Sequence, residues 1–282
     1  MTAGRNDPVG LLIILMEACE VTTSRARQVS LVVKPSRQGH GRDLTSGWEV
    51  DFGEHPVLLN DSVSTTPALL EPLGDRAFLA HFPSEPAAGV WAAAVRDQQW
   101  PGVTDVVLAY CTVGVFADAE QIDLVDLESR LRLIAPTEDT RPHGKRVVIP
   151  VLYDGVDLDD VAARLGLRPA DVIELHCQVE YDVFAIGFLP GFPYAGYLPP
   201  ALAGLARRDS PRVRVPASSV AIAGRQTAVY PTESPGGWHL LGTTPLCIAD
   251  PESGYFPIRA GDRIRFEPIF ASEFEGRRHE RL

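Results

Sequence analysis

The sequence has little positive charge for its length. It holds 26 Lys and Arg against 37 Asp and Glu, which gives a formal net charge of −11 at pH 7. Nucleic acids and anionic membranes both attract clustered positive charge, so this balance argues against either as a partner. The four cysteines (Cys19, Cys111, Cys177 and Cys247) lie far apart and form no CxxC pair. Such spacing favours free thiols in a reducing cytoplasm over disulfides or a zinc site.

Long apolar runs are missing too. The one segment that looks like a targeting signal, Val9–Met16 (VGLLIILM), has eight residues, whereas a membrane-spanning helix needs roughly 20. Asp7 offsets Arg5 in the would-be basic region, and Glu17 follows the apolar run where a signal peptide would be cleaved. We therefore expect a short strand at this position, or a start codon assigned too far upstream, and a cytoplasmic protein.

Ready-made catalytic signatures are absent as well. The sequence contains no GxxxxGK(S/T) phosphate loop, no HExxH zinc motif and no GxSxG nucleophile elbow. Any site must therefore be assembled from scattered residues, and no set of metal ligands is visible.

What the sequence does have is glycine and proline, 24 of each, most densely between Tyr181 and Ala249. Short apolar-alternating pieces bounded by Gly and Pro predict strands of a small barrel or sandwich. In LPGFPY (189–194) and SPGGWHL (234–240), large rings stand beside residues that lack a Cβ or an amide hydrogen. A stiff loop of this kind can bring backbone close to a ligand. A tight barrel corner would give the same pattern, and the pattern alone does not decide between the two.

The chain divides into three segments and is predicted to be an α+β protein. Residues 1–67 show no sustained period, which indicates a poorly ordered or irregular extension. Residues 68–140 combine strand-like alternation, as in Arg76–Phe82, with two amphipathic helical patterns. The order strand, helix, strand, strand, helix fits a small ferredoxin-like α/β layer. Pro136–Gly144 has the composition of a linker, so a second domain is expected over residues 141–282.

The second domain is expected to be a β-barrel with two short helices. Arg146–Tyr153 predicts its first strand, and Asp157–Leu165 and Pro169–Cys177 predict the helices. The helix pair resembles a DNA-reading helix-turn-helix, but its second helix carries Asp171 and Glu174, which would repel phosphate. We therefore expect a helical hairpin that caps the barrel.

Three stretches, GFLPGFPY, RVRVPASSVAIAGRQT and YPTESPGGWHLLGTTP, closely resemble the family of the B subunit of 5-oxoprolinase. Its relatives include the antikinase KipI, allophanate hydrolase subunit 1 and one half of the carboxyltransferase region of urea carboxylase. The resemblance runs from about Leu70 to Ile269. It implies a ferredoxin-like domain followed by a cyclophilin-like β-barrel.

The resemblance also implies a function. The B subunit of a 5-oxoprolinase opens 5-oxo-L-proline to L-glutamate together with separate A-type and C-type subunits. The enzyme consumes ATP with Mg²⁺, and the missing nucleotide motif fits a site shared with the C-type partner. Two rival functions follow from the relatives: a KipI-like inhibitor of a sensor histidine kinase, and the carboxyltransferase half of a urea carboxylase-type enzyme. A prolyl isomerase rests on barrel shape alone and is discounted.

Two residues are predicted to be catalytic. His176 ends the second helix just before the strand that leads into LPGFPY, as its family counterpart does, and imidazole titrates near working pH. A histidine that interacts with the helix dipole is the alternative. Arg212 and Arg214 face the same side of a predicted strand, where a guanidinium could bind a carboxylate or phosphate through paired bonds. The family's matching segment favours Arg212 for this role, and Arg214 is expected to form an exposed ion pair.

Seven further residues are predicted to bind the substrate. Aromatic rings would form apolar walls, an amide and a hydroxyl would orient a small amide, and two adjacent glycines could present N–H groups to an anion. For the tryptophan, simple core packing is a strong alternative. The set comprises Phe192, Tyr194, Gln226, Thr227, Gly236, Gly237 and Trp238.

The chain departs from the family pattern at four positions near these candidates. Ser218 replaces the glycine of PAGS, Ala228 that of QTG, and Tyr197 a glycine of the LGG that follows FPY. Thr243 stands where an arginine of GRTP is common. Each change adds bulk or removes charge, so the substrate and the activity are left open by the resemblance.

Overall fold

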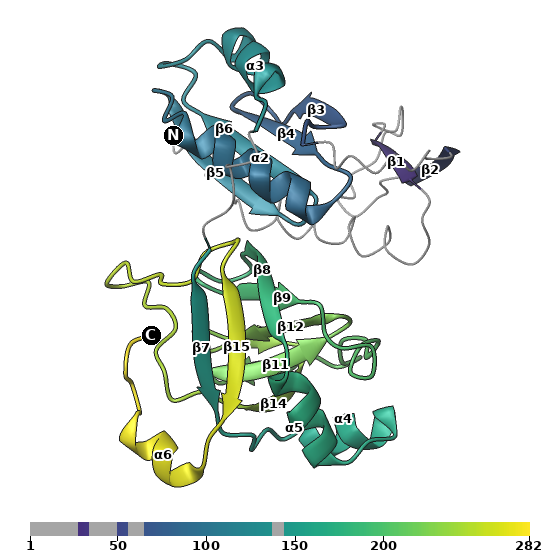
Figure 1. The fold of residues 1–282 in the computed structure, drawn as a ribbon, viewed down its shortest axis with the longest axis vertical. Coiled ribbons are helices and arrows are strands. Elements are labelled where there is room, and N and C mark those ends of the chain that lie inside the picture. The colour runs from purple at the N-terminus through teal and green to yellow at the C-terminus, as the bar shows by residue number, and fades with distance from the viewer. Residues whose placement is uncertain (1–27, 34–49, 56–64, 137–143) are drawn as a thin grey trace, which may run out of the picture.

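The computed structural model describes residues 65–136 and 144–282, together with the backbone of two strands, β1 (Gln28–Val33) and β2 (Val50–His55). These two strands pair antiparallel within the segment predicted to be irregular. The rest of that segment up to residue 64, including Val9–Met16, and the domain boundary predicted near residue 140 lie outside the described residues. The described chain forms two units, one above the other in Figure 1.

The first unit is a four-stranded antiparallel sheet with two helices (Figure 1), and its strand order is β3-β4-β6-β5. The predicted order of strand, helix, strand, strand, helix is confirmed from β4 to α3. The described residues hold no strand between α3 and residue 136, and β3 lies beside β4 instead, so the ferredoxin-like assignment stays a prediction. The elements are β3 (Leu69–Pro72), β4 (Ala77–His81), α2 (Glu85–Asp97), β5 (Val103–Ala109), β6 (Thr112–Ala117) and α3 (Leu124–Leu133).

Capping residues and apolar spacing account for the two helices of this unit. The Ser84 hydroxyl accepts a bond from the Ala87 amide at the start of α2, and Asp123 accepts one from the Val125 amide at the start of α3. Trp91 and Leu127 are fully buried between the helices and the sheet. The helices therefore cover the sheet through their apolar faces.

The second unit is built on a seven-stranded sheet in the order β14-β11-β12-β9-β8-β15-β7. Leu152 and Thr243 exchange two backbone hydrogen bonds of 2.9 and 2.8 Å, which join the edge strands β7 and β14. The sheet is therefore nearly closed into a barrel, and its assignment as cyclophilin-like stays a prediction. The strands of this sheet are β7 (Arg146–Val151), β8 (Glu180–Ile186), β9 (Pro193–Gly196), β11 (Ser219–Ala223), β12 (Gln226–Val229), β14 (His239–Thr243) and β15 (Arg263–Pro268).

Three short helices and a two-stranded ribbon lie outside the seven-stranded sheet. The two predicted helices are present as α4 (Leu158–Leu165) and α5 (Pro169–Cys177), side by side at one end of the unit in Figure 1. A separate antiparallel ribbon pairs β10 (Arg212–Val215) with β13 (Ser234–Gly236). A short helix, α6 (Ala271–Gly276), follows the last strand. No helix among the described residues is both long and apolar enough to pass through a bilayer.

Alternate residues of the barrel strands enter two different apolar clusters, as the period of a strand requires. We call them the barrel core and the aromatic cluster. In β11, Val220 and Ile222 belong to the first, whereas Ala221 and Ala223 belong to the second. The barrel core includes Tyr181, Val183, Ala195, Ile222, Val229, Leu241 and Phe266, and the aromatic cluster includes Ala109, Tyr110, Ala185, Phe192, Tyr194, Ala221, Ala228, Tyr230, Trp238 and Leu240.

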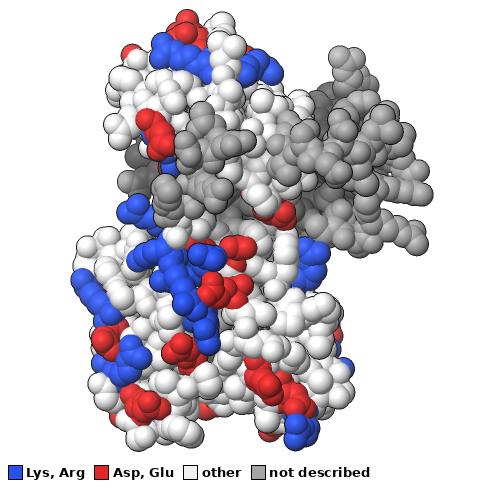
Figure 2. Space-filling model, in the orientation of Figure 1, with Lys and Arg blue, Asp and Glu red and all other residues white. Residues whose placement is uncertain are grey.

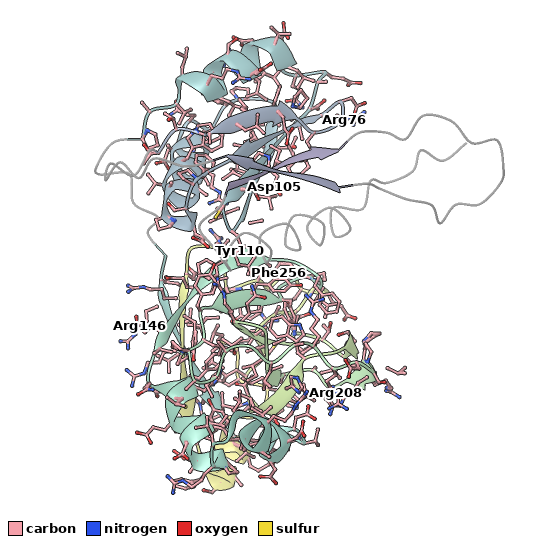
Figure 3. All side chains as sticks on the ribbon, turned by 90° about the vertical axis from the view of Figure 1, so that its right-hand side faces the viewer. Arg76, Asp105, Tyr110, Arg146, Arg208 and Phe256 are labelled. Atoms are coloured by element: carbon pink, nitrogen blue, oxygen red, sulfur yellow. The ribbon has the colours of Figure 1, made fainter. Side chains whose placement is uncertain are left out.

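The first unit rests on the aromatic cluster. The Tyr110 amide donates to the Phe184 carbonyl at 3.3 Å, and their ring centroids lie 5.2 Å apart. Beside them, the Tyr197 hydroxyl donates to a Glu85 carboxylate oxygen at the start of α2. Figure 3 shows Tyr110 where the two units meet.

Basic side chains gather on one face of the barrel, over β7 and β15 (Figure 2). Arg146 and Arg263 lie opposite each other in the parallel register of these strands, and both pair with Glu180 at 2.5 and 3.4 Å. These pairs compensate part of the positive charge of the patch.

Candidate functional site

Three of the predicted wall residues come together in the aromatic cluster. Phe192, Tyr194 and Trp238 have ring centroids 4.8 to 5.9 Å apart in edge-to-face arrangements, and Tyr230 joins them 5.1 Å from Phe192. Such arrangements suit the charge distribution of aromatic rings. All four residues are at most 5% exposed. They therefore form a packed aromatic floor beneath the surface; this agrees with the packing explanation for Trp238, and its role in substrate binding stays a prediction.

The ribbon β10–β13 lies against this floor and brings Arg212 to it. Arg212 is the register partner of Gly236. A Cβ added at Gly236 would lie 2.9 Å from Cζ and 3.0 Å from Cε1 of Tyr230, with the hydroxyl oxygen closer still. Only glycine therefore lets the ribbon pack on Tyr230. Gly237 is less crowded, since the nearest atoms to its added Cβ lie at 3.7 Å.

The Tyr230 hydroxyl connects the floor to the ribbon. Burial raises the pKa of this phenol, while the Trp238 amide, which donates to the hydroxyl, and the charges of Arg207 and Arg212 oppose that rise. The positive guanidinium of Arg212 therefore lies close enough to the aromatic cluster to act on it electrostatically.

A buried aspartate holds Arg212 in place together with a second arginine. Asp157 Oδ1 accepts from Arg212 Nη2 at 2.7 Å and from Arg208 Nη1 at 3.0 Å, and Oδ2 accepts from the Leu240 amide at 2.8 Å. Burial raises the pKa of Asp157, but the bonds from Arg212 and the Leu240 amide outweigh it, so the pKa lies below its usual value. Asp157 is therefore a carboxylate at neutral pH.

Sequence reasoning predicted Arg212 but missed Arg208 and Asp157. Asp157 was expected only as the start of a helix, and its partners lie 51 to 83 residues further along the chain. The sequence of residues 207–212, RRDSPR, is the one local signal of a cationic site. The exposed ion pair predicted for Arg214 is confirmed, because Arg214 pairs with Glu233 at 2.8 Å.

His176 lies on the other face of the sheet, against the barrel core. Its ring stacks on Phe266 at 4.5 Å between centroids and is fully buried. Thr227 donates to the Ala221 carbonyl at 3.2 Å, so its oxygen accepts the His176 Nε2 hydrogen at 2.8 Å. Tyr153 then donates to Nδ1 at 2.7 Å. Both ring nitrogens therefore have protein partners.

Burial also fixes the charge of His176. Desolvation lowers the pKa of the imidazole to about 3, so the ring is neutral at physiological pH. The structure thus separates His176 and Thr227 from the group formed by Phe192, Tyr194, Arg212, Gly236 and Trp238. The acid/base role of His176 stays a prediction. Gln226 precedes Thr227 in β12 and, by strand alternation, lies on the same face as Ala228 of the aromatic cluster.

The four departures from the family pattern are accommodated. Ser218 has φ +66, a left-handed conformation that favours the glycine of the relatives, and its amide donates to the Tyr230 carbonyl at 2.7 Å. The Arg225 guanidinium stacks 4.0 Å from the Tyr197 ring centre. The Thr243 hydroxyl donates to Asp154 at 2.7 Å beside the closure of the barrel, and Ala228 is buried in the aromatic cluster.

Within residues 65–136 and 144–282, no three His, Cys, Asp or Glu side chains gather as a metal site would require.

Residues 68–256 match the family described as "Carboxyltransferase domain, subdomain C and D". Two relatives, both named as the B subunit of 5-oxoprolinase, come from Bacillus subtilis (strain 168) and Escherichia coli O157:H7. The first is 37% identical over 235 residues, which cover 75% of this chain and 97% of the relative. The second is 41% identical over 184 residues, which cover 64% and 84%.

Solved structures agree with this fold. The crystal structure of TTHA0988 superposes with a TM-score of 0.62 at 39% identity and covers 70% of this chain. The matched part is only 40% of that longer protein. The Kluyveromyces lactis urea amidolyase, at a TM-score of 0.55 and 16% identity over 78% of this chain, shares the fold.

Proposed function

The chain belongs to the family of 5-oxoprolinase B subunits, with its carboxyltransferase domain, and from this premise we propose that it is the B subunit of an ATP-dependent 5-oxoprolinase. Its substrate would be 5-oxo-L-proline, a small lactam with one carboxylate, and its product L-glutamate. A-type and C-type subunits would complete the enzyme, and we expect the complex in the cytoplasm.

One observation carries the assignment of the site. Arg212 is held by a buried carboxylate beside a glycine ribbon and a floor of aromatic rings. A guanidinium suits the carboxylate of the substrate, and an apolar floor suits the methylene groups of its ring. Gly237, which is less crowded than Gly236, would let the substrate approach the backbone.

ATP and its Mg²⁺ do not fit this group of residues well. Two guanidinium groups share one carboxylate at Asp157, which leaves one net positive charge, whereas a nucleoside triphosphate carries several negative charges. We therefore assign the phosphate contacts of ATP chiefly to the C-type partner. When bound there, ATP supplies the phosphoryl group that makes the lactam oxygen a better leaving group.

On this proposal the residues of this chain bind and orient the lactam. Arg212 holds the substrate carboxylate, and the aromatic floor keeps water away from one side of the ring. His176 and Thr227 lie behind the sheet, where their hydrogen bond ties α5 to β12 and stabilises the barrel. Gln226, on the nearer face, remains a candidate to contact the substrate amide.

The test is to purify the full chain with its A-type and C-type partners and to measure ATP cleavage with and without 5-oxo-L-proline. ATP cleavage that requires both the lactam and this chain supports the proposal, and R212A should abolish it without breaking the complex. ATP cleavage at the same rate with and without the lactam would refute the proposal. In that event, inhibition of a sensor histidine kinase and biotin-linked carboxyl transfer are the activities to assay.

A further inference from the structure

We propose that Arg208 and Arg212 form a clamp for one small carboxylate, and that Asp157 is the positioning residue that aims both guanidinium groups. The clamp rests on the proposed function only for the identity of that carboxylate, which would be the one on 5-oxo-L-proline. Arg208 and Asp157 then join Arg212 as specificity-determining residues.

The charges and the unused hydrogen-bond donors lead to this assignment. Each arginine gives one terminal nitrogen to Asp157 Oδ1. Arg208 Nε and Arg212 Nη1 are buried and have no hydrogen-bond partner among the described residues. A buried N–H without an acceptor destabilises a protein. Both guanidinium groups therefore retain hydrogen-bonding capacity that Asp157 does not use.

The two arginines of the clamp can be reached from solution, although Asp157 cannot. The side chains of Arg208 and Arg212 are 33% and 23% exposed, whereas that of Asp157 is 4% exposed. A ligand can therefore meet the outer parts of the two guanidinium groups, and Asp157 stays behind them as a fixed counter-charge. In Figure 3, Arg208 lies further down the barrel than Tyr110 and Phe256, away from the junction with the first unit.

Backbone contacts tie the clamp to the rest of the candidate site. The Arg208 amide donates to the Gly237 carbonyl at 2.8 Å, and Arg212 faces Gly236 across the ribbon. The Leu240 amide, which bonds Asp157, belongs to a residue of the aromatic cluster. A carboxylate in the clamp would therefore lie beside the ribbon that covers Tyr230.

The net charge favours a carboxylate over a phosphate. Two arginines and one aspartate leave a single positive charge, which balances one monoanion, while phosphate at neutral pH carries more negative charge. The flat, two-oxygen shape of a carboxylate also suits donors that come from two guanidinium groups.

The experiment measures ligand binding to the full chain in complex with its partners, by calorimetry. The probes are 5-oxo-L-proline, cyclopentanecarboxylate, the neutral lactam 2-pyrrolidinone and inorganic phosphate. We expect R208Q and R212Q each to weaken binding of both carboxylates at least about tenfold and to leave 2-pyrrolidinone unchanged. The matched control is R214Q, from the same strand as Arg212, which should bind every probe as the wild type does because Arg214 pairs with Glu233 at the surface.

The outcomes separate the clamp from the proposed function. If the complex cleaves ATP in response to 5-oxo-L-proline but R208Q binds carboxylates normally, the clamp is refuted and the proposed function stands. If carboxylates bind through both arginines but no lactam-dependent cleavage occurs, the clamp stands and the proposed substrate is wrong. Preferential binding of phosphate, or no binding of any carboxylate by the wild type, refutes the clamp.

D157N tests the positioning role. It removes the negative charge but keeps an oxygen that can accept from the Leu240 amide, so the fold should survive. The clamp then carries two positive charges, and the ratio of phosphate to carboxylate affinity should rise at least about tenfold. An aspartate that only stabilised the fold would leave that ratio unchanged, so an unchanged ratio in folded D157N would overturn the role.

Discussion

Replacing Gly236 with alanine should destabilise the barrel unit strongly. The new Cβ would lie 2.9 Å from Cζ and 3.0 Å from Cε1 of Tyr230, closer than carbon atoms pack. The Tyr230 ring is buried and is in contact with Phe192 and Phe188, with ring centroids 5.1 and 6.4 Å away, so these rings oppose its movement. Overpacking of this kind costs about 1–3 kcal/mol.

A second loss follows if the ring does move. The buried Trp238 amide donates to the Tyr230 hydroxyl, and an amide left without an acceptor costs about 1–3 kcal/mol. Together the two effects predict that G236A lowers the free energy of unfolding by about 2–6 kcal/mol. Urea denaturation followed by circular dichroism should show this as a lower midpoint at an unchanged m-value.

The matched control is G237A, one residue further along. There the nearest atoms to an added Cβ lie at 3.7 Å, an ordinary contact, so the change should stay within about 1 kcal/mol of the wild type. The packing argument is wrong if the two variants unfold at the same urea concentration, or if G236A is as stable as the wild type.

Three further predictions concern single side chains. Burial lowers the pKa of His176 from 6.5 to about 3, so between these pH values the unfolded chain binds more protons than the folded chain. The free energy of unfolding should therefore rise with pH across this window, by at most about 1.4 kcal/mol per pH unit. H176Q should flatten this slope in urea titrations carried out at several pH values. S218G should be within about 1 kcal/mol of the wild type, since the relief of φ +66 is offset by the greater freedom of glycine in the unfolded chain; a large loss of thermal stability would contradict this. Y197G removes the Arg225 stack and the bond to Glu85, so it should loosen the two units and increase limited proteolysis between them, whereas unchanged cleavage would show that the contact is unimportant.

Helix caps and apolar periodicity predicted much of this fold, because these local features determine where many of its helices and strands form. The cap and apolar spacing of α3 and the two short helices before β8 all lie where periodicity indicated. Period alone does not show which face of a strand a ligand meets. Gln226 and Thr227 were both expected to bind the substrate, but neighbours in a strand point to opposite faces. The position of His176 on the far side decides which one is nearer to the site.

The arginine clamp was out of reach of the sequence for a different reason. Arg208 lies in the irregular stretch between β9 and β10, where no period constrains its direction. Its partner Asp157 is 51 residues earlier in the chain and precedes a helix, where an aspartate is commonplace. Only the closure of the barrel brings the two together, so the second arginine of the site follows from tertiary structure alone.

Thr227 lies on the core face of the barrel sheet, opposite the face that carries the aromatic cluster and Arg212. T227V keeps the shape of the side chain but leaves the His176 Nε2 hydrogen without its acceptor, which should lower stability by about 1–3 kcal/mol. Turnover per folded molecule should remain that of the wild type, because the aromatic cluster and Arg212 lie on the other face. Thermal unfolding and an activity assay normalised to folded protein measure the two effects separately. A T227V variant that folds normally and yet loses turnover would place the reacting groups on the core side, beside His176, and would move the site away from Arg212.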